Sequence, residues 1–355
     1  MGTKDDWRRV RQQRSKPPGL ADRDEERRRV FQAALTQAEE LWDAAATAGP
    51  ASRPLPLFYC LSQACRAVCA AWTAEEQWRP RSHGLKRRES NDPSPEMRVF
   101  DYAAQVNHPD QGAYGMVAAA TESVTVTGHA SAAELWASLP GFPTPREYIG
   151  DRPRCLLVEL ARAPGSTNVG YGLFGLGSRT HIAFQFTAPP LEELVANYPT
   201  LRGIVEDGTR RSILGFDEPL FRIEHEDGTA RDPIEVGTLV PGAESSFGNR
   251  VVRPKVGEEA VGPPSEFLTL YTLLFCLSEL ARYHPDTWVL ALDPDESRAA
   301  VTLERGLDVA LERAPAVISD ALQGPLPRLL AAEIRRMSEE AAAASEVAAP
   351  DDPAE

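Results

Sequence analysis

The chain has 355 residues, enough to bury a sizeable core in one large domain or two closely packed ones. Its net charge of −14 argues against broad, non-specific nucleic-acid binding, although a local basic patch could still act. Five cysteines in mostly apolar segments do not predict a disulfide framework. Because no signal peptide or bilayer-length apolar run is visible, we expect a cytoplasmic protein without membrane spans.

The N-terminal third is predicted to be helical after a polar start. Residues 1–21 are rich in Arg, Lys and Pro and predict a disordered arm. An N-terminal helical block is predicted over residues 22–92. Its helices, Asp22–Ala48 and Leu55–Trp72, repeat apolar residues at three- and four-residue spacing, so we expect them to form an antiparallel pair.

The polar face of the Leu55–Trp72 helix is the first candidate for function. Tyr59, Gln63 and Arg66 lie roughly 180° from the apolar stripe, at about 100° per residue. Short or charged residues would be expected throughout on a plain solvent face. This mixture therefore suggests a pocket wall, the alternative being an ordinary helix with one half-exposed face.

A basic segment, His-Gly-Leu-Lys-Arg-Arg-Glu, follows at positions 83–89. Gly84 permits backbone angles that other residues avoid, so we expect His83 to sit on a turn. Neighbouring cations should disfavour the charged imidazole, and neutral imidazole can act as a general base. These cations are Arg79, Arg81, Lys86, Arg87 and Arg88. The same cations could hold a phosphate or carboxylate, or form a solvated basic loop.

Residues 93–262 predict a mixed α/β region rich in Pro and Gly. Its expected elements are extended segments at Met97–Val106 and Ala113–Gly128, a Ser131-capped helix at Ala132–Leu139, a helix at Leu191–Asn197, and strands at Arg154–Leu160, His181–Phe186 and Phe221–His225. Residues 170–177 match the dinucleotide fingerprint G-x-G-x-x-G. A predicted strand follows this run where the fingerprint requires a helix, so we interpret it as an inter-strand loop.

A C-terminal helical block is predicted over residues 263–337. Its first helix starts at the N-cap Ser265, is apolar around nearly its whole circumference and ends near Arg282. We expect it to pack on Leu55–Trp72, which would bring Arg282 near His83. Asp293–Glu296 predicts the start of another helix. Its resemblance to a calcium loop fails at the required glycine, so no metal is expected, and no cofactor is predicted. Residues 338–355 predict a disordered acidic tail.

Several segments resemble landmarks of the YaaC-like family of bacterial proteins. They are LPLFYCLSQACRAVCAAW with the following HGLKRRE, the Gln111-Gly-Ala-Tyr-Gly segment with its short following helix, and SEFLTLYTLLFCLSELARYHPDTW. The resemblance spans roughly Leu55 to Leu322, with no landmark between about Arg154 and Gly262. It implies a family without implying a particular reaction.

The helix that starts near Tyr59 and the later histidine are also similar to HEPN-type helical domains. Some of these domains are ribonucleases with a closely spaced Arg and His, a pair that can polarise a phosphate and move a proton. Arg79 and His83 do not have that spacing, nor do Arg282 and His284.

Together these features predict an α+β fold with a mainly helical core. The first functional hypothesis is a binding or regulatory module with a polar, cationic pocket for an anionic small molecule or protein partner. Its candidate ligand-binding residues are Tyr59, Gln63, Arg66, His83, Lys86 and Arg282.

Two alternatives stay open. One is a helical dimerisation scaffold that binds no ligand, so a homodimer is among the expected partners. The other is a metal-independent, HEPN-like ribonuclease in which His83 is the base and Arg66 or Arg282 stabilises the phosphorane. Nucleic acid is not the favoured partner, with RNA left open, and the sequence does not decide whether the protein is an enzyme.

Overall fold

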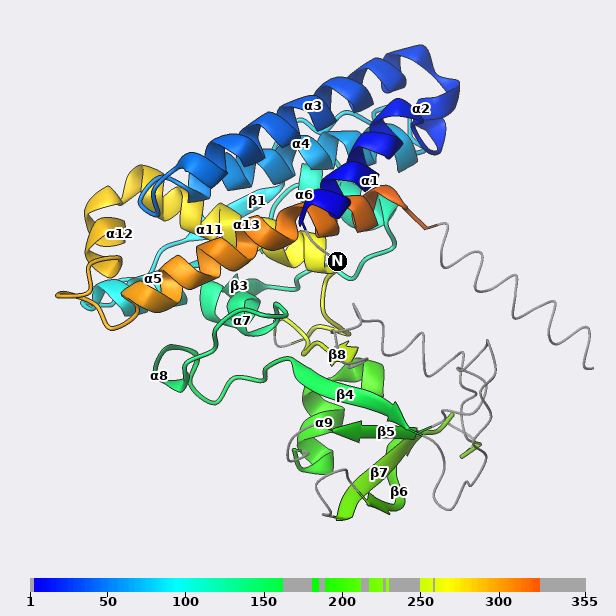
Figure 1. Ribbon diagram of the computed structural model, residues 1–355, viewed down its shortest axis with the longest axis vertical. Coiled ribbons are helices and arrows are strands. Elements are labelled where there is room, and N and C mark those ends of the chain that lie inside the picture. Colours follow the sequence, from blue (N-terminus) through cyan, green and yellow to red (C-terminus); the bar gives the residue numbers. More distant parts are fainter. Residues whose placement is uncertain are drawn as a thin grey trace, which may run out of the picture.

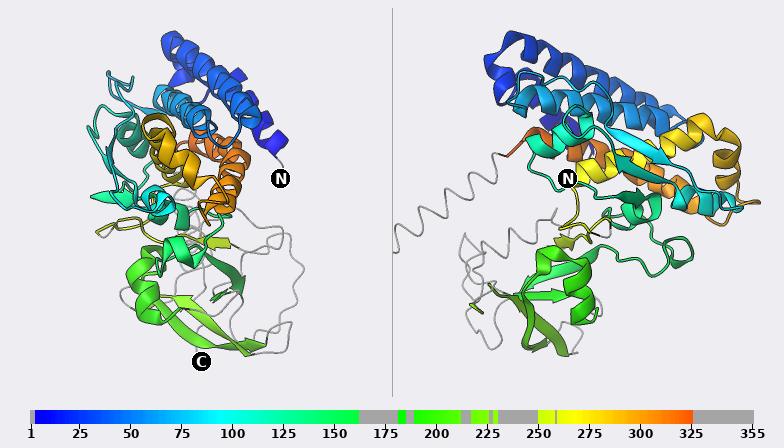
Figure 2. Two further views of the ribbon diagram at one scale, coloured as in Figure 1. Left: turned by 90° about the vertical axis from the view of Figure 1, so that its left-hand side faces the viewer. Right: turned by 180° about the vertical axis from the view of Figure 1, so that it is seen from behind.

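The computed structural model describes residues 3–161, 181–184, 189–211, 217–225, 228–229, 250–257 and 259–325. A layered body of helices forms one part, and a smaller unit around a five-stranded sheet lies below it in Figure 1 and in both views of Figure 2. The fold is α+β and mainly helical, as the sequence predicts.

The helical body is built around two central helices. The elements in this part are α1 (Thr3–Ser15), α2 (Leu20–Arg23), α3 (Glu25–Thr47), α4 (Pro54–Trp72), α5 (Pro95–Asp101), α6 (Ala113–Ala120), α7 (Ala132–Ala137), α8 (Arg146–Ile149), α11 (Glu266–Tyr283), α12 (Pro285–Ala291) and α13 (Ala300–Leu322). Helices α3 and α4 pack side by side as predicted. Helix α11 contacts α4, α6, α7, α12 and α13, which explains why apolar residues surround it.

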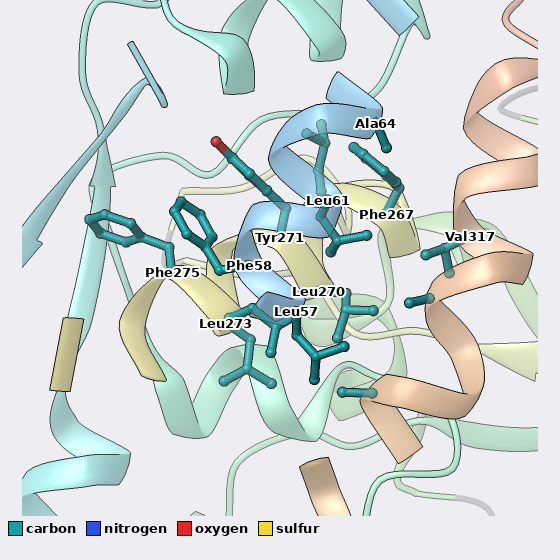
Figure 3. Close-up of a cluster of buried hydrophobic side chains, with 14 of the residues drawn as sticks. Leu57, Phe58, Leu61, Ala64, Phe267, Leu270, Tyr271, Leu273, Phe275 and Val317 are labelled. Carbon is teal, nitrogen blue, oxygen red and sulfur yellow. The ribbon is translucent and has the colours of Figure 1, made fainter. Parts of the chain in front are cut away.

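Apolar stripes join α4, α11 and α13. Figure 3 shows Leu57 and Leu61 of α4 among Leu270 and Tyr271 of α11, with Val317 of α13 nearby. The Ser265 side chain accepts a hydrogen bond from the Leu268 N–H and caps α11, as predicted. The N-terminal and C-terminal helices are therefore parts of one hydrophobic core.

A three-stranded antiparallel sheet lies against α11. Its order is β1 (Leu85–Arg88), β2 (Ala103–Val106) and β3 (His129–Ser131). The predicted cap at Ser131 is confirmed, because Ser131 and Glu134 form a reciprocal capping box at the start of α7.

The second sheet has its own small core. Its order is β6 (Ile204–Arg211), β7 (Asp217–Ile223), β5 (His181–Phe184), β4 (Leu156–Ala161) and β8 (Arg250–Val252), with all neighbours antiparallel. Helix α9 (Leu191–Asn197) and the 3-10 turn η1 (Pro199–Leu201) contribute Leu194 and Leu201 to that core. Each predicted strand here overlaps an observed one, although β7 begins at Asp217 and residues 185–186 lie outside the described residues. Helix α9 has the predicted bounds.

Arg253 links this sheet to the helical body. Its guanidinium donates hydrogen bonds to the Ser138 carbonyl (2.7 Å), the Pro264 carbonyl (2.6 Å) and Thr269 Oγ1 (2.6 Å). These acceptors belong to the end of α7 and the start of α11. The residue directly after β8 therefore fixes the sheet against the helix that anchors the core.

The prediction of a disordered arm at residues 1–21 is wrong. These residues form α1 and α2, and α1 packs on α13 and α3. Trp7 and Val10 are buried, and the Trp7 ring meets Trp42 edge-on at a centroid distance of 5.6 Å. The segment is polar overall, but one narrow face of α1 is apolar. The helix is stable because this face packs against other helices.

Two further local predictions are wrong, and a third, the extended segment at Met97–Val106, is correct only for Ala103–Val106. Residues 97–106 are the end of α5 followed by β2, because Ser94 caps a helix that begins with Pro95. Residues 113–120 form the helix α6, whose burial overrides the strand preference of its Val and Tyr residues. Asp293–Glu296 is a turn in which Asp293 Oδ1 accepts from the Asp295 N–H, so α13 begins only at Ala300.

Two other predictions, the G-x-G-x-x-G run at residues 170–177 and the acidic tail at residues 338–355, lie outside the described residues. Among the helices that are described, none combines the length and apolar character that crossing a bilayer requires.

The buried face of α1 can be tested by Trp7→Ala. We expect this change to reduce the free energy of unfolding by about 3–5 kcal/mol, because it removes a large buried ring that packs against Trp42 of α3. Urea denaturation of the full chain measures the effect, with the exposed neighbour Arg8→Ala as control. Equal stability of the two variants would mean that α1 does not belong to the core.

Candidate functional site

A cleft of about 390 Å³ lies between the polar face of α4 and the C-terminal part of α11. Five of the six predicted ligand-binding residues line it: Tyr59, Gln63, Arg66, His83 and Arg282. The sixth, Lys86, is exposed on β1 and is not part of the lining. The structure therefore brings together residues that are more than two hundred positions apart in the sequence.

Helix α4 supplies one wall through its periodicity. Tyr59, Gln63 and Arg66 follow one another at four- and three-residue spacing, so they project from the same face while Leu57 and Leu61 face the core. The Tyr59 hydroxyl accepts a hydrogen bond from Arg282 Nη1 at 3.4 Å. This contact joins the α4 wall to the α11 wall.

His83 is held by backbone contacts on the third side. Its carbonyl accepts hydrogen bonds from the Tyr114 N–H (3.2 Å) and from the Tyr271 hydroxyl (3.1 Å). Gly84 has a φ of 80°, which favours glycine there. His83 does not sit on a turn as predicted, because His83 and Gly84 lead directly from the bridge between Ser82 and Gly112 into β1. A Cβ added at Gly112 would lie 2.3 Å from Gly84 Cα. The two glycines therefore allow two backbones to cross closely enough to fix His83.

The tautomer of His83 follows from its neighbours. Nδ1 accepts a hydrogen bond from the Leu85 N–H at 3.1 Å, so the neutral ring carries its proton on Nε2. The ring lies 4.9 Å from the Phe275 ring, centroid to centroid. Burial lowers the pKa of His83, and the Glu279 carboxylate partly opposes this shift. In its neutral form the side chain is therefore a hydrogen-bond donor through Nε2.

The predicted direction of the His83 pKa is correct, but the predicted cause is wrong. The sequence suggested repulsion from neighbouring cations, whereas desolvation is the main cause. Two of those cations have carboxylate partners: Arg79 pairs with Glu26, and Arg87 pairs with Glu279 (3.1 Å). These ion pairs therefore weaken the electrostatic repulsion that Arg79 and Arg87 exert on the protonated imidazole.

Arg66 and Arg282 are the cations that the cleft itself presents. Within the part of the chain that the structure describes, neither forms an ion pair with a carboxylate. Arg282 is held by the Tyr59 hydroxyl and by the Tyr283 ring, whose centroid lies 5.0 Å from its guanidinium carbon. The cleft therefore offers two guanidinium groups whose charge no described acidic side chain cancels.

Glu279 lines the cleft and was not predicted from the sequence. It stands three residues before Arg282 in an otherwise apolar helix, and that position is the signal that could have identified it. Arg87 pairs with Glu279 and also with Glu89, each at 3.1 Å. Within the described residues Glu279 forms no ion pair with Arg66 or Arg282.

Metal or thiol chemistry finds no support among the described side chains. They contain no group of three or more His, Cys, Asp or Glu residues placed to hold a metal ion. All five cysteines are free, and burial raises the pKa of Cys69 and Cys155 to about 12. Thiols held in the protonated form are poor nucleophiles, so the cysteines serve the packing.

The close crossing beside His83 can be tested by Gly112→Ala. The added methyl group would overlap the Gly84 backbone, so we expect a loss of about 2 kcal/mol or more in the free energy of unfolding. The matched control is Gly49→Ala, where no atom lies within 4 Å of the added Cβ. A Gly112 variant as stable as the control in thermal unfolding would contradict this geometry.

The His83 pKa can be measured by NMR titration of its ring protons. We expect a midpoint below the ordinary value of 6.5, and a lower one still in Glu279→Gln, because the opposing carboxylate is lost. Between the lowered pKa and 6.5 the unfolded chain binds more protons than the folded chain. His83 should therefore make the free energy of unfolding rise with pH in that window. A midpoint at or above 6.5 would show that desolvation does not dominate the pKa of His83.

Comparison with known proteins identifies a family for the chain, but it provides no related protein from which a role for this site can be taken. The sequence profile of the family described as YaaC-like Protein matches residues 4–322. This range includes α1 and the five-stranded sheet, which carry none of the landmarks recognised in the sequence. No curated protein and no solved structure matches the chain. Since the profile covers most of its length, the chain belongs to the YaaC-like family.

Proposed function

We propose that the protein is a binding module that holds a small anionic ligand in the cleft between α4 and α11. The proposal rests on one observation, that neither Arg66 nor Arg282 has a carboxylate partner in the part of the chain that the structure describes. In a chain with 52 acidic residues, both lack a carboxylate partner within the described residues although they line the same cleft. Arg53 and Arg313 do have such partners, in Asp308 and Glu266. Arg81 and Arg88 also have none among the described residues, but neither of them lines the cleft.

The chemistry of the lining supports an oxyanion as ligand. A guanidinium presents several N–H donors in a plane that matches carboxylate and phosphate oxygens. The His83 Nε2–H and the Gln63 amide add neutral donors at the same cleft. The volume of about 390 Å³ is near the lower end of the roughly 300–1,000 Å³ typical of small-molecule sites, which supports one small ligand.

The ribonuclease hypothesis uses the same residues but is less well supported. A general base needs an unprotonated ring nitrogen, and the Leu85 N–H already occupies Nδ1 of His83. The remaining nitrogen carries the proton, so the neutral ring is arranged to donate a hydrogen bond. This favours a role for His83 in binding.

The five free cysteines further support our inference of a reducing compartment such as the cytoplasm.

Anion binding can be tested by thermal unfolding with ribose 5-phosphate as probe. We expect the melting temperature to rise with ligand, corresponding to about 2.7 kcal/mol at a concentration 100 times the Kd. Arg66→Gln and Arg282→Gln should each weaken binding about tenfold or more, because each removes a guanidinium from the cleft.

The matched control is Lys86→Gln, which removes an exposed cation of the same basic segment outside the cleft. If Lys86→Gln weakens binding as much as the arginine variants do, the basic segment rather than the cleft attracts the anion. If the wild type cuts a short RNA and the His83→Ala variant leaves it intact, the ribonuclease hypothesis replaces the proposal of a binding module.

A further inference from the structure

Anion binding alone does not explain the two exposed tyrosines at the cleft. Among the aromatic Phe, Tyr and Trp side chains that the structure describes, only Tyr59 (41%) and Tyr283 (48%) are exposed. Both line this cleft. Exposed aromatic surface that is confined to a concave, cationic site indicates a contact surface for an apolar, flat part of the ligand.

Both tyrosines contact Arg282, one of the two arginines that we propose bind the anionic group. The Tyr59 hydroxyl bonds Arg282 at 3.4 Å, and the Tyr283 ring lies under the Arg282 guanidinium at 5.0 Å. The Arg87 guanidinium lies over the Tyr283 ring as well, at 4.8 Å. The ring of Tyr283 is thus engaged by arginines, while no described cation lies over the ring of Tyr59. Tyr59 is therefore the ring that can receive a flat ligand group.

The deeper lining continues this apolar surface. Phe58 stacks on Tyr271 with ring centroids 5.2 Å apart, and Phe275 lies 5.8 Å from Phe58. Glu279 adds a carboxylate that can accept a hydrogen bond from an amino group. A ligand that uses all these features has an anionic group, a flat ring and an exocyclic amine.

We infer that the ligand of the cleft is a mononucleotide. Its phosphate pairs with Arg66 and Arg282, and its base stacks on Tyr59. This inference rests on the proposed anion-binding function and names its ligand class. A sugar phosphate would leave the Tyr59 ring uncovered. The limited volume favours a single nucleotide over a strand of RNA.

The inference is tested by isothermal titration calorimetry of the full chain with adenosine 5′-monophosphate and with ribose 5-phosphate. Stacking of one base on an aromatic side chain contributes enough binding energy for roughly a tenfold gain in affinity. We therefore expect the nucleotide to bind about tenfold more tightly than the sugar phosphate. The two probes share the phosphate and the ribose, so their ratio isolates the base.

Two substitutions of Tyr59 isolate its ring. Tyr59→Phe and Tyr59→Leu both lose the hydroxyl that contacts Arg282, but only Tyr59→Phe keeps an aromatic face. We expect Tyr59→Phe to retain the preference for the nucleotide and Tyr59→Leu to lose it. Because Tyr59 is exposed, neither change disturbs the core. Loss of the preference in both variants would overturn the assignment of the base to the Tyr59 ring.

The failures of the two proposals can be told apart. Equal affinity of the wild type for the two probes would overturn the nucleotide inference and leave anion binding standing. Absence of binding to either probe would overturn both. Tighter binding of a short single-stranded RNA than of the mononucleotide would overturn the inference in favour of a strand-binding cleft.

Discussion

The packing of α4 on α11 is the contact on which the rest of the structure depends. Phe58 lies against Tyr271 and Phe275 (Figure 3). The hydroxyl of Tyr271 donates a hydrogen bond to the His83 carbonyl. Each helix has one surface committed to this core, so the remaining polar surface of α4 and the last turn of α11 face each other across the cleft. The same interaction that buries the apolar stripes therefore assembles the candidate site.

The cleft presents positive charge although the chain as a whole is acidic. The chain is acidic overall, and cations near the cleft such as Arg79 and Arg87 are paired with carboxylates. Arg66 and Arg282 are placed where the described acidic residues do not reach them, except for Glu279, which Arg87 already engages. The anion-binding role that we propose for this cleft therefore depends on local charge, since the net charge of −14 opposes general attraction of anions.

Strong periodicity and capping made much of this arrangement predictable. The polar face of α4 placed Tyr59, Gln63 and Arg66 together, and the apolar circumference of α11 correctly implied its contact with α4. Features that depend on distant partners were not predictable. Helix α1 needs Trp42 and α13, and α6 is helical because it is buried. The charge environment of His83 depends on which carboxylate each nearby arginine meets, and local sequence does not contain that information.

The proposed function requires that Arg66 and Arg282 together hold the anionic group of a ligand. The most direct measurement is NMR of the arginine side-chain Nε–Hε groups in the full chain during titration with adenosine 5′-monophosphate. We expect the resonances of Arg66 and Arg282 to move together and saturate, while that of the exposed Arg88 stays in place. Shifts spread evenly over exposed arginines, or saturation at residues away from the cleft, would contradict it.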